Sequence, residues 1–173
     1  MYQGLVLLYV GAVLILNGLW MLGRIDDREI GAINVLVGGV SLAVALRLAF
    51  GPDADPASVK GAALSLLFAF TYLWVAYNRY SGADGRGLGW FSLFVALTAV
   101  PVAAETLANA ATPWQVWSGL SWAAWAVLWW VFFLLLARGR PLARVAAWLA
   151  IAEGVATGWI PGYLLLTGAI PLP

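Results

Sequence analysis

Cysteine and histidine are both absent from this sequence of 173 residues. Without cysteine there is no disulfide framework, no thiol nucleophile and no thiolate ligand for a metal. Without histidine, the chain has neither the commonest general base nor the commonest metal ligand. It also lacks the one side chain whose unperturbed pKa lies near neutrality. We therefore expect no metal site and no catalysis that depends on these residues.

Charged residues are scarce, at 10% of the chain, whereas a soluble domain carries about 25%. Hydrophobic residues make up 64%, so the composition predicts an integral membrane protein. The net charge is +1 with no run of basic residues, which argues against nucleic acid as a partner. The first apolar stretch lacks a basic region before it and is long enough to span, so we expect no cleavable signal peptide.

The usual motifs of enzymes are also missing. The sequence contains no G-x-S-x-G motif and no Walker or dinucleotide-binding glycine motif. The glycine-rich turn GADGRGLG gives no indication of phosphate binding. A membrane enzyme would have to use Glu153, Glu105, tyrosines and asparagines alone. We predict no catalytic residues, no cofactor and no enzyme activity.

Six apolar segments of about 20 residues divide the chain, the length that a bilayer core requires. The connectors between them are rich in Gly, Pro, Asp and Arg, which end helices. Because the segments are continuous rather than alternating, helices are favoured over a barrel. We predict one six-helix transmembrane domain over residues 1–173. The expected spans are Gly4–Leu22, Gly31–Phe50, Gly61–Tyr80, Leu88–Ala108, Gln115–Ala137 and Val145–Gly168.

The distribution of Lys and Arg predicts the orientation in the membrane. Cytoplasmic connectors carry an excess of these residues. Only Arg47 and Lys60 belong to one side of the predicted bundle. The connectors after the first, third and fifth spans hold the other seven, namely Arg24, Arg28, Arg79, Arg86, Arg138, Arg140 and Arg144. These odd connectors are therefore expected in the cytoplasm and both termini outside.

Tryptophans are spaced as a column in the fifth span. Trp122, Trp125 and Trp129 stand at i, i+3 and i+7, in a stretch without charge from Pro113 to Ala137. This spacing places the three indoles on one side of a helix. Tryptophan in membrane proteins usually gathers at the interfaces. A column through the middle of a span offers flat apolar walls with one donor each, which suits a narrow path for a small, planar, neutral solute.

Two other spans carry stripes on one face. The first has Gln3, Leu7, Val10, Leu14 and Asn17, and the third has Phe68, Thr71, Tyr72 and Val75. From spacing alone, ordinary helix packing is the commoner explanation for such stripes, with Asn17 bonding to a neighbouring helix in the first span. Asn34 and Asn78, near span ends, are expected to satisfy local backbone or headgroup groups.

Glu153 lies near the middle of the sixth span, where an ionised carboxylate is costly. Thr157 is one turn away and could donate a hydrogen bond to it. The acid either orients a pore-lining group or contacts the solute, or it makes a buried structural hydrogen bond between helices. Glu105, nearer the end of the fourth span, is expected at the membrane interface.

Sequence blocks in all six spans resemble the urea and short-chain-amide channel family of AmiS/UreI type. They cover nearly the whole chain, in order and without large gaps. The blocks are GLVLLYVGAVLILNG, NVLVGGVSL, LLFAFTYLWVAYN, FSLFVALTAVP, WAAWAVLWW and WLAIAEGVATGWIPGYLL. The resemblance implies a hexameric ring of six-helix protomers. Each protomer would hold its own pore, around a lipid-filled centre that does not conduct.

The resemblance also implies which residues line the pore. They are Leu7, Val10, Leu14, Asn17, Phe68, Thr71, Tyr72, Trp122, Trp125, Leu128, Trp129 and Glu153. Two positions depart from the family pattern, which is apolar where Gln3 stands and has an indole where Ser118 stands. Acid-activated members carry histidines in longer outer loops. Because this chain has none, we expect no such acid gate and conduction near neutral pH.

The sequence thus predicts a passive channel for urea or short-chain amides, such as acetamide and formamide, in the inner membrane of a bacterial cell. A hydrolase that uses the solute, an amidase or a urease, would be a separate cytoplasmic protein. Three alternatives stay open. The chain could conduct another small neutral solute such as ammonia or water, it could be a membrane protein that transports nothing, or it could be an enzyme that uses Glu153.

Overall fold

The computed structural model describes residues 2–170, and these form six helical stretches long and apolar enough to cross a membrane. The predicted all-helical fold with six apolar helices is confirmed. The first four stretches are α1 (Tyr2–Met21), α2 (Glu29–Phe50), α3 (Pro56–Ser81) and α4 (Arg86–Ala108). The fifth is α5 (Pro113–Phe132) with the π-helix η1 (Phe133–Ala137), and the sixth is α6 (Ala143–Glu153), the π-helix η2 (Gly154–Trp159) and α7 (Ile160–Leu166). The ends of the predicted domain, residues 1 and 171–173, lie outside the described residues.

Polar caps explain why some helices begin before the apolar runs that predicted them. Asp55 caps α3, because its carboxylate accepts from the backbone N–H of Ser58 at 2.7 Å. The Ser58 hydroxyl in turn accepts from the backbone N–H of Asp55 at 2.8 Å. Thr112 and Gln115 form the same reciprocal box at the start of α5. Each box is followed by proline at the first helical position, where its missing N–H costs nothing.

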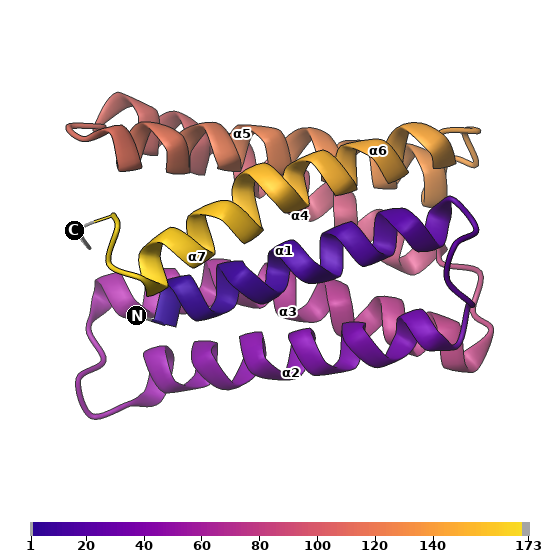
Figure 1. Cartoon of the computed structure of the whole chain (residues 1–173), viewed down its shortest axis with the longest axis horizontal. Coiled ribbons are helices and arrows are strands. Elements are labelled where there is room, and N and C mark those ends of the chain that lie inside the picture. Colours follow the sequence, from indigo (N-terminus) through magenta and orange to yellow (C-terminus); the bar gives the residue numbers. More distant parts are fainter. Residues whose placement is uncertain (1, 171–173) are drawn as a thin grey trace.

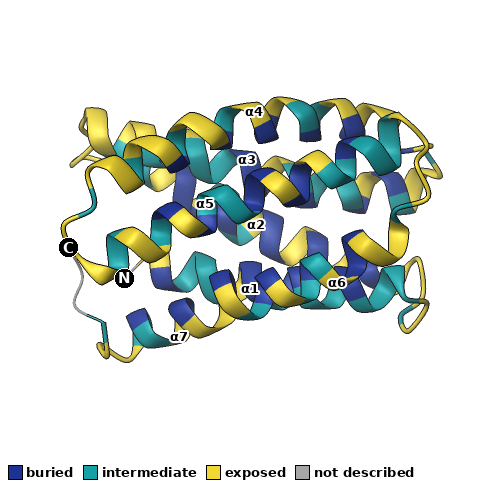
Figure 2. Ribbon diagram, turned by 90° about the horizontal axis from the view of Figure 1, so that it is seen from above, coloured by how far each residue is buried: buried dark blue, intermediate teal, exposed yellow. Residues whose placement is uncertain are grey.

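The six stretches pack as three close pairs: α2 with α3, α4 with α5, and α1 with the α6–η2–α7 stretch. The first and last helices of the chain therefore lie side by side, and both termini are at the same end of the bundle (Figure 1). Buried residues follow the helix faces that meet inside the bundle, and exposed residues cover the outside (Figure 2). The buried faces of most of the helices therefore turn toward the middle of the bundle.

Glycines allow α1 and the last stretch to come into backbone contact. Gly4, Gly11 and Gly18 repeat every seven residues on α1, and Gly154, Gly158 and Gly162 repeat every four residues on the partner. A Cβ atom on Gly11 would overlap the backbone of Trp159, and one on Gly158 would overlap the backbone of Gly11. Small residues are the usual means of close helix approach in membranes. The predicted spans gave no indication of this contact.

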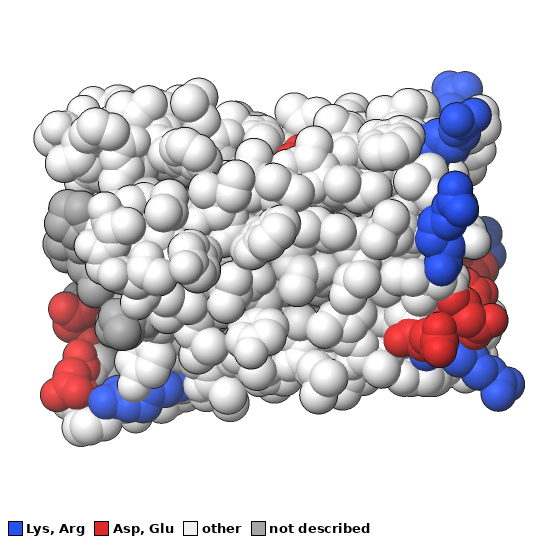
Figure 3. Space-filling model, in the orientation of Figure 1, with Lys and Arg blue, Asp and Glu red and all other residues white. Residues whose placement is uncertain are grey.

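Charge is confined almost entirely to the two ends of the bundle (Figure 3). The arginine-rich end holds the connectors between α1 and α2, α3 and α4, and η1 and α6. The termini end holds both chain termini and the other two connectors. Arg47 and Lys60 are the two basic residues of the termini end. The structure thus separates the seven arginines of the odd connectors from these two.

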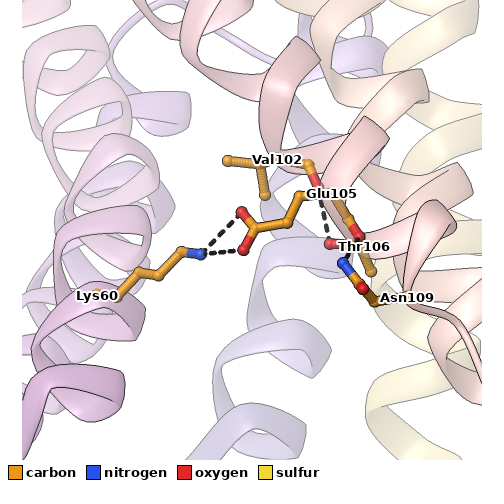
Figure 4. A network of polar contacts seen from close by, with 5 residues as sticks. All are labelled: Lys60, Val102, Glu105, Thr106 and Asn109. Atoms are coloured by element: carbon orange, nitrogen blue, oxygen red, sulfur yellow. Dashed lines mark hydrogen bonds and ion pairs between the residues drawn. The ribbon is translucent and has the colours of Figure 1, made fainter.

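An ion pair joins α3 to α4, which pack on each other less than the three close pairs do. The Nζ atom of Lys60 lies 2.8 Å from both carboxylate oxygens of Glu105 (Figure 4). Both side chains are more than half exposed, so the pair contributes little to stability by itself. Its place near the end of α4 agrees with the expectation that Glu105 lies toward an interface rather than in the middle of a span.

Candidate functional site

Two cavities enter the bundle, one from each end. The termini-end cavity has a volume of about 360 Å³ and is lined by residues that include Gln3 and Trp117. The arginine-end cavity has a volume of about 290 Å³ and is lined by residues that include Asn17 and Arg79. Among the described residues, Phe68 of α3 and Trp125 of α5 are the two that line both cavities. They mark the constriction where the two cavities approach each other.

The constriction is filled by aromatic rings in edge-to-face contact. The ring of Phe68 lies 4.8 Å from that of Trp125, centroid to centroid, with an interplanar angle of 80°. It is also 4.8 Å from Trp129 and 5.9 Å from Trp122, at 64° and 67°. Such geometry is favoured because the positive edge of one ring meets the negative face of the other. The three spaced indoles and Phe68 therefore form one cluster.

The structure brings most of the predicted pore residues to these cavities. Leu7, Val10 and Trp122 line the termini-end cavity. Phe68 and Trp125 line both. The arginine-end cavity is lined by Leu14, Asn17, Thr71, Tyr72, Leu128 and Trp129. Gln3 and Ser118, the two departures from the family pattern, both line the termini-end cavity and make it more polar.

Glu153 is the predicted pore residue that lines neither cavity. It is buried at the end of α6, and its Oε2 atom is enclosed without a hydrogen-bond partner among residues 2–170. The expectation that Thr157 donates to this carboxylate was wrong. The Thr157 hydroxyl donates instead to the backbone carbonyl of Glu153 at 2.6 Å, because a threonine in a helix reaches the carbonyl four residues earlier.

Thr157 connects the constriction to the backbone of the last span. The indole N–H of Trp125 donates to the Thr157 hydroxyl at 2.8 Å, so the hydroxyl accepts from α5 and donates within its own helix. Thr157 lies in η2, one of the widened turns that recur at functional sites. Pro161, just after η2, lacks the N–H that would close a regular turn there. The hydrogen bond to Thr157 thus fixes the direction in which the indole of Trp125 points.

A buried amide pair supports the wall of the arginine-end cavity. Asn34 of α2 donates to the side-chain oxygen of Asn17 at 2.7 Å, and Asn17 donates to that of Asn34 at 3.2 Å. Asn34 also donates to the backbone carbonyl of Ile30 at 2.8 Å, the local bond that its position predicted. A bond from Asn17 to another helix was the alternative expectation, but Asn34 was not identified as its partner. The available signal was an amide in each of two successive apolar spans, which in membranes tend to bond across helices.

The model of the AmiS/UreI family transporters matches residues 2–169. The chain belongs to this family. It is 43% identical over 166 residues to a protein of Mycolicibacterium smegmatis whose name describes a transporter of amidate substrates, covering 95% of this chain and 76% of that protein. It is 38% identical to the acid-activated urea channel of Helicobacter pylori, covering 94% of this chain and 96% of that one.

Solved structures of that channel resemble the fold closely. The crystal structure of the urea channel from Helicobacter pylori matches with a TM-score of 0.87 and 38% identity, covering 98% of this chain and 99% of the other. The cryoEM structure of the closed state matches with a TM-score of 0.84, covering 96% and 98%. Membership of the AmiS/UreI family thus extends over nearly the whole six-helix bundle, including both cavities and the constriction.

Proposed function

We propose that this AmiS/UreI-family protein is a passive channel that conducts urea or short-chain amides, such as acetamide and formamide, down their gradient. The observation that carries the proposal is the pair of cavities that approach each other from opposite ends and meet at the Phe68–Trp125 constriction. The names of the relatives, which refer to amidates and urea, support the class of solute. A side-chain movement at the constriction would join the cavities.

Selection rests on the chemistry of the lining. Aromatic and aliphatic faces admit a planar neutral solute, and a few polar groups replace part of its hydration. We assign this part to Asn17, Thr71 and the indole N–H groups of Trp122 and Trp129, since the N–H of Trp125 is held by Thr157. Replacement must stay partial, because a permeant has to leave as readily as it enters. An ion is rejected because an apolar lining does not offset the cost of removing its water.

The membrane arrangement is part of the proposal. The arginine-rich end faces the cytoplasm and both termini face outward, across the inner membrane of a bacterial cell. Six protomers form a ring, each with its own pore. Many large hydrophobic side chains are exposed on the outside of the bundle, and the face between its two ends is nearly free of charge (Figure 3), which suits contact with lipid and with neighbouring protomers. Native mass spectrometry from mild detergent is expected to give six times the chain mass of 18.5 kDa.

The chain moves the amide without cleaving it, and a cytoplasmic amidase or urease consumes it. Opening does not depend on acid, because the sequence contains no histidine to be protonated between pH 5 and 8. Glu153 has a structural role in the last span, beside the solute path, and is not a catalytic acid.

The test is solute entry into proteoliposomes, followed by light scattering in a stopped-flow instrument. Urea, acetamide and formamide are expected to enter many times faster than into liposomes without protein. Water and ammonia permeabilities, measured in the same vesicles, separate the proposal from a facilitator of those solutes. Ammonium release from the amides tests for hydrolysis. Amide entry no faster than in empty liposomes would refute the proposal.

A further inference from the structure

The mouth of the arginine-end cavity holds polar groups to which the proposed solute path has so far assigned no part. They are Trp20 of α1, together with Asn78 and Arg79 near the end of α3, and all three line the cavity. Asp27, in the connector between α1 and α2, contacts two of them. Three separate segments of the chain therefore meet at this mouth.

Trp20 and Asp27 hold the guanidinium of Arg79 in place. Its Nη1 atom lies 3.5 Å from the carboxylate of Asp27, and its central carbon lies 5.0 Å from the centre of the Trp20 ring. The indole N–H of Trp20 donates to the same carboxylate at 2.6 Å, which closes the triangle. Stacking on an indole and pairing with an acid are both stabilising for arginine. The position of the positive charge at the mouth is therefore well defined.

Arg79 retains hydrogen-bonding capacity that the protein does not use. A guanidinium has five N–H donors. Within residues 2–170 no acceptor is at hydrogen-bond distance and angle from any of them, and the Nε atom is enclosed without a partner. The enclosed Nε atom is out of reach of a solute, but the side chain is 23% exposed and lines the cavity, so its other N–H groups can donate to an acceptor there. The carbonyl oxygen of urea or an amide is an acceptor of this kind.

Asn78, which directly precedes Arg79 in α3, adds a hydrogen-bond acceptor to the donors of the guanidinium. The residue is 3% exposed and lines the cavity, yet its side-chain amide has no hydrogen-bond partner among the described residues. Unlike the Nε atom of Arg79, its amide oxygen and nitrogen are not enclosed. A carboxamide carries one acceptor and two N–H donors, so it can pair with another carboxamide through both.

We propose that Asn78 and Arg79 form a binding site for the carboxamide group of the permeant at the mouth of the arginine-end cavity. The inference rests on the proposed channel function and adds a step to it. The guanidinium donates to the carbonyl oxygen of urea or an amide, and the Asn78 oxygen accepts from its N–H. A solute of the same size that lacks a carboxamide loses these contacts. The site is open on its cavity side, which keeps binding weak enough for release.

The test measures urea and acetamide flux into proteoliposomes over a range of solute concentrations. Asn78→Leu and Arg79→Met keep side-chain size while removing the proposed partners. Each is expected to raise the concentration for half-maximal flux about tenfold, the effect of one lost hydrogen bond of moderate strength. Asn109→Leu and Arg138→Met are matched controls, since both residues are exposed and line neither cavity. Their half-saturation should equal that of the wild type.

The outcomes separate this site from the channel itself. If the wild type conducts and both variants match their controls, the binding site is refuted and the channel stands. If the wild type does not conduct, both proposals fall. Should Arg79→Met not reach the membrane in folded form, Asn78→Leu decides the question alone, because it leaves the ion pair between Arg79 and Asp27 intact.

Discussion

Trp125 links the constriction to the last span through two different parts of one side chain. Its ring packs against Phe68, and its N–H donates to Thr157. A buried indole N–H without an acceptor costs more than the bond itself is worth. The orientation of the aromatic cluster therefore depends on a hydroxyl that belongs to another helix.

Thr157→Val is expected to lower the free energy of unfolding by about 1–3 kcal/mol, because it leaves the Trp125 N–H buried and unpaired. Unfolding in mixtures of mild and denaturing detergent measures the change. Thr98→Val is the control, since Thr98 also donates to the carbonyl four residues earlier but accepts no bond from another helix. Equal stability losses in the two variants would show that the contact with Trp125 contributes nothing.

The Asn17–Asn34 pair gives a double-mutant cycle. Each single change to leucine leaves one amide buried without its partner, and is expected to cost about 1–3 kcal/mol. The double variant should be more stable than the sum predicts, by about 0.5–1.5 kcal/mol, the range found for polar pairs between membrane helices. Additive losses, measured by the same unfolding assay, would mean that the two amides do not stabilise each other.

At the level of residues, the sequence predicted the column of tryptophans but not the hydrogen bond that holds it in place. Helical spacing was enough to place Trp122, Trp125 and Trp129 on one side of a helix, because the period of an α-helix is fixed. It could not show that Thr157 bonds to Trp125, since that contact depends on how two distant helices pack. Asn78 and Arg79 were missed as cavity residues for the same reason.

Among the elements, the contact between α1 and the α6–η2–α7 stretch brings the first and last spans of the bundle together. Here backbones touch, and glycine is the only residue without a side-chain carbon. The six spans could be predicted from length and composition. The adjacency of the first and last could not, although the glycine repeats were visible in the sequence. The π-helices η1 and η2 were not predicted.

Gly11→Ala is expected to destabilise the protein by about 1–3 kcal/mol or more, because the added methyl overlaps the backbone of Trp159. Gly39→Ala is its control, as a Cβ there meets no atom within 4 Å. The control should change stability by no more than about 1 kcal/mol. Detergent unfolding and the yield of monodisperse protein measure both. A Gly11→Ala protein as stable as the control would contradict the packing described.

Over the whole molecule, the charged residues lie at the two ends of the bundle, apart from Glu153, and the sequence contains no histidine. Hydrogen bonds from Ser58 hold the pKa of Asp55 below its ordinary value, and hydrogen bonds from Arg86 do the same for Asp84. A carboxyl whose pKa is lowered by folding stabilises the fold above its ordinary pKa. That contribution is lost only as the pH falls through the lowered value, below about pH 4.

Flux should vary little between about pH 5 and 8, because the sequence contains no histidine to be protonated in that window and the carboxyls of Asp55 and Asp84 titrate below it. The measurement is urea entry into proteoliposomes with the pH changed equally on both sides. A steep rise on acidification within this range would show that a group other than histidine gates the pore.

The most direct test of the central claim compares two variants of neighbouring phenylalanines on α3. Phe68 is buried at the constriction, whereas Phe70 is 45% exposed on the outside of the bundle. Phe68→Trp adds bulk where the two cavities meet, and Phe70→Trp adds the same bulk facing outward. For correctly folded protein in liposomes, the account predicts that Phe68→Trp abolishes urea and acetamide flux while Phe70→Trp conducts like the wild type. Equal flux through both variants would contradict it.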